Sequence, residues 1–298
     1  MDVLIPVGPY DKPEWVSRSI KSALSQRARV IVYDNSERDD LSSLIDQLGT
    51  QGDLIHHHAK RMSKINMAKL RNQLLTLTEE RIAIMLDSDV VLPDGAIDVM
   101  RKTVEDGASF TWMHYAYSED EIGLGLKPGE ENPNLGCAAL DTHVIKELGM
   151  FDEIYDRDED IWLYSKLKRS GHRVQPSPGR CLHLNKVHSR TDLKSSLKEA
   201  RTNLWRSKYD MMLMLDGLTN PTFLTGYAYY GSYYMVGIVS PFLPPFALLY
   251  LPLVLYGLWY YRGPKRYALN LIPGLALVIS LPAGVIRAVR AMRLAKRR

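Results

Sequence analysis

The chain has 298 residues, 46% hydrophobic and 24% charged, a composition that excludes a disordered or collagen-like protein. Its two cysteines are too few for a disulfide framework. The net charge is +4, but residues 217–298 hold nine Lys and Arg and no Asp or Glu, so the rest of the chain is acidic. Because nucleic-acid affinity rests on neutralising phosphates, an acidic domain excludes nucleic acid as a partner.

In chain order, short apolar runs alternate with amphipathic segments up to about residue 105. We expect strands at residues 3–7, 30–33, 54–57 and 82–86. Helices are expected between them, at residues 15–26, 41–48, 65–76 and 96–104. This alternation predicts an α/β fold, a mainly parallel sheet flanked by helices. Ligands of such sheets bind beyond the carboxyl ends of the strands.

Acidic residues stand at two of those strand ends. Asp87 and Asp89 follow the fourth expected strand with Ser88 between them, and Asp34 ends the second. Two carboxylates at this spacing can face one bound group, and their oxygens suit Mg²⁺ or Mn²⁺ bridging to substrate phosphates. Such a pair also occurs in ordinary turns, and Asp34 alone also fits a turn residue that caps the next segment. The position after a buried strand favours a metal site.

Further along, four charged residues at 157–160 precede an expected helix at 161–169. Acidic residues at a helix start are favoured by the helix dipole. A carboxylate there could equally serve as a general base beside an acceptor hydroxyl. The residues alone leave both interpretations open. The run of three histidines at 56–58 is interpreted as a strand end or loop, because neighbouring side chains on an extended chain point to alternate sides.

The C-terminal third is apolar. Residues 217–261 and 267–286 contain no charge, whereas about 20 apolar residues of helix suffice to cross a bilayer. We expect two spans, near 246–261 and 268–286, rather than three, because two return the basic tail to the side of the N-terminal domain. The positive charges at 262–266 oppose this arrangement. The expected organisation is therefore a cytoplasmic catalytic domain (1–216), an interfacial segment (217–242), transmembrane helices (243–286) and a basic cytoplasmic tail (287–298).

A cytoplasmic location of residues 1–216 is also expected from the first residues, which lack a basic region ahead of a long apolar run. Cys137 and Cys181, taken as unpaired, would fit a reducing compartment. With the two spans expected in the C-terminal third, the protein is expected to be a multi-pass membrane protein.

Seven motifs occur in an order that resembles family 2 glycosyltransferases. They are VLIPV (3–7), VIVYDNS (30–36), LRN (70–72), IMLDSDV (84–90), NLGCAAL (134–140), MFDE (150–153) and EDIW (159–162). The resemblance covers roughly residues 1–190. It implies an inverting enzyme with a nucleotide-sugar-binding fold of type A. The apolar end resembles that of members acting on lipid-linked acceptors.

The resemblance also implies roles for individual residues. Those assigned to the nucleotide-sugar are Pro6, Val7, Asp34, Arg71, Asp87, Ser88, Gly136, Cys137 and Glu159. Among them Asp34 would lie by the base, Arg71 by the phosphates and Asp87 by the ribose. Asp89 would bind the divalent metal, and Asp160 would be the catalytic base. A histidine after the last core strand often completes such a site, and His183 is preferred to His188.

The implied function is transfer of one sugar from a nucleotide-sugar donor to a lipid-linked or glycolipid acceptor, with Mn²⁺ or Mg²⁺. The QxxRW motif of polymer-forming relatives is absent, although Leu204-Trp205-Arg206 lies in its vicinity. The second strand ends in Asp34-Asn35 where many relatives have two aspartates. Transfer to a polyprenyl phosphate is an alternative, as is a silent scaffold that binds nucleotide sugar or lipid.

Overall fold

The computed structural model describes residues 1–62, 65–125, 132–186, 192–218 and 221–295, the side chains of 221–223 excepted. Contacts divide the chain into two compact units, Met1–Asn185 and Lys186–Arg298. We refer to them as unit 1 and unit 2. The domain boundary at residue 216 inferred from composition stays a prediction.

Unit 1 contains an eight-stranded sheet with the order β3-β2-β1-β4-β7-β6-β8-β5. The strands are β1 (Asp2–Val7), β2 (Arg29–Asp34), β3 (Leu54–His58), β4 (Ile82–Leu86), β5 (Val90–Val91), β6 (Phe110–Ala116), β7 (Cys137–Asp141) and β8 (Val174–His183). The first four run parallel, whereas β7 is antiparallel to both β4 and β6. The predicted mainly parallel sheet is confirmed, with β7 and β5 as its antiparallel exceptions.

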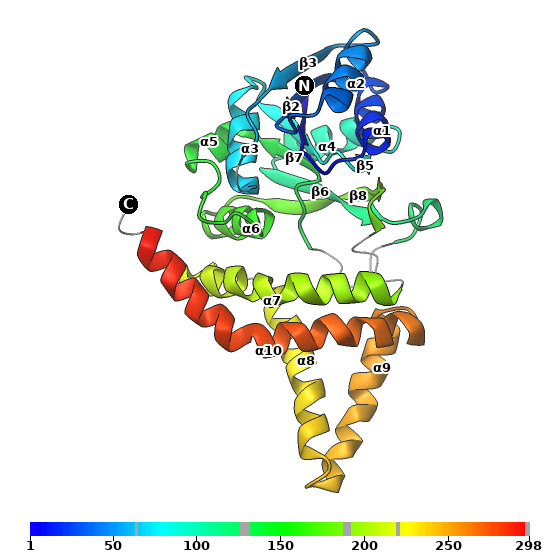
Figure 1. The fold of residues 1–298 in the computed structure, drawn as a ribbon, viewed down its shortest axis with the longest axis vertical. Coiled ribbons are helices and arrows are strands. Elements are labelled where there is room, and N and C mark those ends of the chain that lie inside the picture. The colour runs from blue at the N-terminus through cyan, green and yellow to red at the C-terminus, as the bar shows by residue number, and fades with distance from the viewer. Residues whose placement is uncertain (63–64, 126–131, 187–191, 219–220, 296–298) are drawn as a thin grey trace. The chain divides into compact units, whose positions relative to one another are not determined.

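The helices of unit 1 flank this sheet (Figure 1). They are α1 (Pro13–Leu24), α2 (Asp39–Gly49), α3 (Met67–Thr76), α4 (Ala96–Glu105), α5 (Thr142–Glu147) and α6 (Glu159–Arg169), with a 3₁₀ turn at Glu119–Glu121. Two of these helices begin at a side-chain cap, and at α3 the Asn66 side chain accepts from the Lys69 N–H at 3.0 Å. Asp141 caps α5 in the same way. The four strands and the four helices expected up to residue 105 are all present, and their bounds differ from the expected ones by a few residues.

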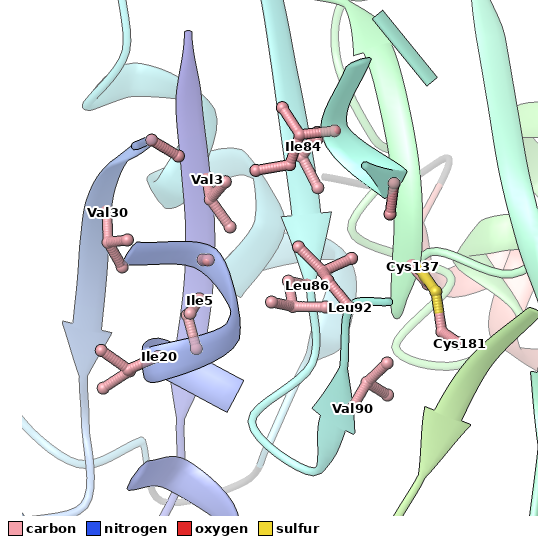
Figure 2. Close-up of a cluster of buried hydrophobic side chains, with 14 of the residues drawn as sticks. Val3, Ile5, Ile20, Val30, Ile84, Leu86, Val90, Leu92, Cys137 and Cys181 are labelled. Carbon is pink, nitrogen blue, oxygen red and sulfur yellow. A yellow bond between two sulfur atoms is a disulfide. The ribbon is translucent and has the colours of Figure 1, made fainter. Parts of the chain in front are cut away.

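Strands β1 and β4 are almost entirely apolar and buried, because the centre of the sheet is covered on both faces. Val3 and Ile5 of β1 pack with Val30, Ile84 and Ile20 in one cluster, shown in Figure 2. Leu4, between Val3 and Ile5, points to the other face and is also fully buried. Burial on both faces explains why the sequence shows continuous apolar runs there instead of alternation.

Two cysteines meet beside this core (Figure 2). Cys137, the first residue of β7, and Cys181 of β8 form a disulfide with their Cα atoms 6.7 Å apart. The expectation of unpaired cysteines is therefore wrong. Pairing of β6 with β7 stops at Trp112–Ala138, and β6 is irregular between Trp112 and His114, so β7 and β8 approach each other there. The two cysteines are 44 positions apart, and the sequence between them gives no signal of this approach.

Unit 2 is helical, with α7 (Leu193–Leu215), α8 (Pro221–Val239), the 3₁₀ helix η3 (Pro244–Leu249), α9 (Tyr250–Tyr260) and α10 (Pro264–Ala295). Helices α7 and α10 run side by side, and α8, η3 and α9 form a hairpin (Figure 1). By length and composition, α10 is the one helix of the described chain suited to cross a membrane. The expectation of several spans is corrected, because the segment 244–260 is apolar but shorter, and prolines 244 and 245 hold its start in a 3₁₀ helix.

Candidate active site

The carboxyl ends of β1, β2 and β4 meet at one edge of the sheet. Val7 pairs with Asp34 across β1 and β2, so Pro6, Val7 and Asp34 lie together as the sequence predicts. Because β7 is antiparallel to β4, its amino end reaches the same edge. There the Asp87 N–H donates to the Gly136 carbonyl at 2.9 Å. The edge therefore gathers residues that are up to 130 positions apart in the chain.

Asp11 joins this edge, although sequence reasoning missed it. Its Oδ2 accepts from the Gly8 N–H at 2.8 Å and from the Ser88 hydroxyl at 2.7 Å. Burial raises the pKa of Asp11, and the neighbouring Asp87 adds to the rise. The available signal was its place in a Gly- and Pro-containing loop directly after the first strand, which ends at the same edge as Asp87.

The three carboxylates of Asp11, Asp87 and Asp89 repel one another. Burial, together with the charges of Asp87 and Asp11, raises the pKa of Asp89 to about 7. Crowded, partly buried carboxylates are unfavourable as anions unless a cation lies between them. Their oxygens are the ligands preferred by Mg²⁺ and Mn²⁺, so the residues fit the divalent ion expected here.

His183, the last residue of β8, stands next to this cluster. Pairing with Val90 of β5 holds it there, and its Nε2 is 3.9 Å from Asp89 Oδ1. Its ring lies edge-on to the buried Tyr115, with centroids 4.6 Å apart. The structure thus brings together the two residues predicted to bind the metal. His188, the other candidate, lies outside the described residues.

Arg71 of α3 connects three parts of the site from a buried position. Its Nε donates to Glu159 at 2.9 Å, Nη1 to the Leu135 carbonyl at 3.2 Å and Nη2 to Asp87 at 3.2 Å. Burial opposes its charge, but Asp87 and Glu159 outweigh this effect and raise the pKa of Arg71. In this structure the guanidinium positions two carboxylates, and its predicted contact with phosphates stays a prediction.

Gly136 is held close to two site residues. A Cβ at this position would collide with the Tyr115 hydroxyl and with the Asp87 carboxylate. Burial raises the pKa of Tyr115 well above its usual range, so the hydroxyl remains a proton donor. The next residue, Cys137, is buried with its sulfur in the disulfide, so its backbone is the part that can approach a ligand.

Asp34 lies in a second polar cluster at the same edge. It accepts from the Ser36 N–H at 2.9 Å and the Ser42 hydroxyl at 2.8 Å, and His56 Nε2 lies 3.4 Å away. Burial alone would raise the pKa of Asp34, but these hydrogen bonds, that from His56 above all, hold it well below its usual range. Asp34 is therefore a carboxylate ready to accept hydrogen bonds from a ligand.

The histidine run follows the alternation expected of a strand. His57 stacks on Tyr33, whereas the rings of His56 and His58 lie 3.8 Å apart. One donor atom each from Asp34, His56 and His58 lies within 4.8 Å of the others, close enough for one metal ion. His56 Nδ1 is 2.7 Å from Asp46, so both of its nitrogens already face a carboxylate. We interpret the cluster as an ion-pair network.

Asp160 is the second residue of α6, and its Oδ1 accepts the Ile161 N–H at 2.8 Å. It is partly exposed and adjoins Glu159, which Arg71 connects to Asp87. The structure thus places Asp160 one residue from the network of the site, and its role as a base stays a prediction.

The family model described as "Glycosyl transferase family 2" matches residues 2–166, which contain all of the candidate site residues except His183 and His188. No curated protein sequence matches the chain.

A mannosyltransferase of Pyrobaculum calidifontis, PcManGT, solved in complex with GDP-Man and Mn²⁺, is similar with a TM-score of 0.66 and 16% identity. The alignment covers 96% of this chain and 86% of that one. Residues 1–349 of S. aureus TarS are similar with a TM-score of 0.50 and 14% identity over 66% of this chain. The chain covers 64% of that TarS fragment. At such identities the likeness shows a shared fold of the glycosyltransferase type A.

Proposed function

Because the chain belongs to glycosyl transferase family 2, we propose that it is a membrane-attached inverting enzyme moving one sugar from a nucleotide-sugar donor to a lipid-linked or glycolipid acceptor. The observation that carries this proposal is the group of Asp11, Asp87 and Asp89 beside His183 at the sheet edge. A nucleotide diphosphate is anionic, and a cation held by this group would offset both sets of charges.

The proposed cation is Mn²⁺ or Mg²⁺, held by Asp89 and His183. When bound, it stabilises negative charge on the departing diphosphate without proton transfer. The similarly folded mannosyltransferase of P. calidifontis was solved with GDP-Man and Mn²⁺, which supports this assignment.

The remaining residues divide between the donor and the acceptor. Asp34, with the backbone of Pro6 and Val7, would accept hydrogen bonds from the base. Asp87 and Ser88 would face the ribose and diphosphate, and Arg71 with Glu159 would keep Asp87 in place. The close approach of Gly136 and Cys137 to Asp87 would leave room for the sugar.

Asp160 would take the proton from an acceptor hydroxyl as its oxygen attacks the anomeric carbon, on the face opposite the departing nucleotide. This single displacement inverts the anomeric configuration. A polyprenyl phosphate oxygen is already anionic and needs no base, so with that acceptor Asp160 would only position groups. A lipid-linked acceptor agrees with the apolar and basic composition of unit 2.

The test is nucleotide release from UDP-, GDP- and dTDP-sugars with Mn²⁺ or Mg²⁺ and a lipid extract. Asp89→Asn should abolish metal-dependent release, whereas Asp98→Asn, an exposed aspartate of α4, should not. Loss in Asp160→Asn supports a hydroxyl acceptor, and retained release supports a polyprenyl phosphate. Metal-dependent nucleotide binding without release from any donor would contradict the proposal and indicate a silent scaffold.

A further inference from the structure

The long apolar helix α10 lies against a charged helix. The Asn203 side-chain amide of α7 donates to the Pro273 carbonyl at 3.0 Å, and the Ser207 hydroxyl donates to the Ser280 carbonyl at 3.3 Å. At Gly284 a Cβ would collide with Ser207. The apolar middle of α10 thus packs along α7. Helix α7 carries seven charged residues, Lys194, Lys198, Glu199, Arg201, Arg206, Lys208 and Asp210.

This pairing argues against α10 as a membrane span. If α10 crossed the bilayer, α7 would enter the hydrocarbon with it. Each charged side chain near the centre costs at least about 2.5–3.5 kcal/mol, and seven of them outweigh the gain from α10. The composition of α10 alone fits a span, but its contacts with the charged helix α7 argue against one.

Tyrosine hydroxyls tie the first part of the hairpin to the same pair of helices. Tyr227 donates to Asp210 of α7 at 2.7 Å, and Tyr234 donates to the Leu271 carbonyl of α10. Tyr229 donates to the Leu253 carbonyl at 2.9 Å and so holds α8 to α9. Tyrosines are common at the level of lipid headgroups, where the ring meets apolar chains and the hydroxyl meets polar groups.

Beyond Tyr234 the hairpin exposes apolar side chains that no described part of unit 2 covers. Phe242 is 82% exposed and Leu248 is 76% exposed. Others exposed over the same end are Met235, Ile238, Leu243, Phe246, Leu249, Leu251 and Leu255. From Tyr234 to the end of α8 the helix extends about 8 Å, and the turn adds a few more, so this end reaches roughly half of a hydrocarbon core of about 30 Å.

Basic residues stand at both ends of α10. Arg262, Lys265 and Arg266 stand at the turn from α9 into α10, and Arg287 and Arg290 lie near the end of α10. Unit 2 as a whole has sixteen Lys and Arg against four Asp and Glu. Such a surface complements anionic lipid headgroups, each nearby positive charge contributing about 1 kcal/mol.

We propose that the end of the α8–η3–α9 hairpin inserts into one leaflet of an anionic bilayer, while α7 and α10 lie among the headgroups of that leaflet. No described segment then crosses the membrane. All the positive charges of unit 2 stay on one side, which removes the conflict that residues 262–266 create in a two-span arrangement. This inference rests on the proposed membrane attachment and on nothing in the sugar-transfer chemistry.

Cysteine labelling of the full-length protein tests the arrangement. The variants are Phe242→Cys at the hairpin end, Lys265→Cys before α10 and Arg293→Cys near its end. Each is added from outside to sealed vesicles of phosphatidylcholine and phosphatidylglycerol and treated with a membrane-impermeant maleimide. The wild type is the control, because both native cysteines are buried in the disulfide.

We expect rapid labelling at positions 265 and 293, and protection at 242 until detergent dissolves the vesicles. A bimane attached at 242 beforehand should be quenched by lipids with a spin label in the acyl chain. Protection at 265 or 293 would mean that α10 crosses, and would overturn the proposal. Protection from the maleimide at 242 without quenching by the lipid spin label would also overturn the proposal. A second copy of the chain, and not lipid, would then cover the hairpin. Neither readout depends on sugar transfer, so a failed activity assay leaves this test intact.

Discussion

The two units of the chain differ in the exposure of their apolar side chains. In unit 1, Val3, Leu4 and Ile84 are fully buried in the strands of the sheet. In unit 2, Phe242 and Leu248 stand at least three-quarters exposed on a hairpin without charges. A sheet covered by helices buries its own apolar surface in water. An exposed apolar hairpin needs lipid or a protein partner to cover it. Composition alone shows that both units contain many hydrophobic residues, and packing shows in which unit they stay exposed.

Charge separates the units in the same way. Unit 1 has thirty Asp and Glu against twenty-two Lys and Arg, and unit 2 has the opposite excess. An acidic unit that binds an anionic nucleotide must concentrate positive charge locally. Arg71 supplies one such charge, and its guanidinium donates to three protein acceptors. The proposed divalent cation at Asp89 would add positive charge at the same edge, which is why metal dependence is central to the proposed function.

The largest expected effect comes from removing that buried cationic side chain. Arg71→Met leaves Asp87 and the buried Glu159 without their partner, which should lower the free energy of unfolding by about 3–5 kcal/mol. The matched control is Arg101→Met, whose exposed pair with Asp98 is worth at most about 1 kcal/mol. Urea unfolding of both variants in detergent measures the difference. Equal losses would show that the site does not depend on this bridge.

The same leucine substitution in each unit tests the comparison directly. Leu4→Ala should destabilise unit 1 by about 2–5 kcal/mol, because it opens a cavity in a packed core. Leu248→Ala should change unfolding in detergent by less than about 0.5 kcal/mol, since that side chain is exposed. It should nevertheless weaken binding to anionic vesicles about tenfold, because apolar area is lost from the lipid contact. Vesicle sedimentation measures this, and unchanged binding would contradict lipid insertion.

Much of unit 1 could be predicted from its sequence because its signals are local. Apolar runs fixed β1, β2 and β4, and strand ends carrying Asp34 and Asp87 indicated the edge where ligands bind. The contribution of Asp11 could not be predicted, since it depends on how the loop after β1 folds back onto Ser88. The pairing of Cys137 with Cys181 depends on the irregularity in β6, which has no local signature.

The arrangement of unit 2 could not be predicted from its sequence, because it depends on contacts between distant segments. Hydropathy identifies the apolar segments correctly, but it treats each one separately from its neighbours. The contacts of Asn203 and Ser207 with α10 join a charged helix to an apolar one, and no window of sequence contains both. Hydropathy therefore predicts two spans, whereas α10 is the one described helix long and apolar enough to cross a membrane.

Gly136→Ala should reduce nucleotide release about a hundredfold, equivalent to about 2.7 kcal/mol. The added methyl group would press on Asp87 and the Tyr115 hydroxyl, displacing groups of the proposed donor site. Gly123→Ala is the control, because a Cβ there meets nothing within 4 Å. Steady-state release with the preferred donor measures the effect. Equal rates for the two variants would show that the close approach at Gly136 has no bearing on the reaction.

The smallest effect concerns the charge network at the end of β2. Burial opposes protonation of His56, but hydrogen bonds to Asp34 and Asp46 outweigh it and raise the pKa of His56 above its ordinary value of 6.5. A raised pKa contributes stability that is complete below the unfolded value and is lost as pH rises through the folded value. His56→Gln should therefore cost about 1 kcal/mol near pH 6 and markedly less near pH 9.

Unfolding measured at both pH values checks this prediction, with Asp46→Asn as the graded control. That variant removes one of the two carboxylates facing His56 and keeps Asp34, so it should show the same pH trend at reduced size. A cost of His56→Gln that does not change with pH would mean that the ring acts through packing alone. Side-chain packing, and not paired charges, would then stabilise the end of β2. The two units would in that case differ in the burial of their apolar side chains alone.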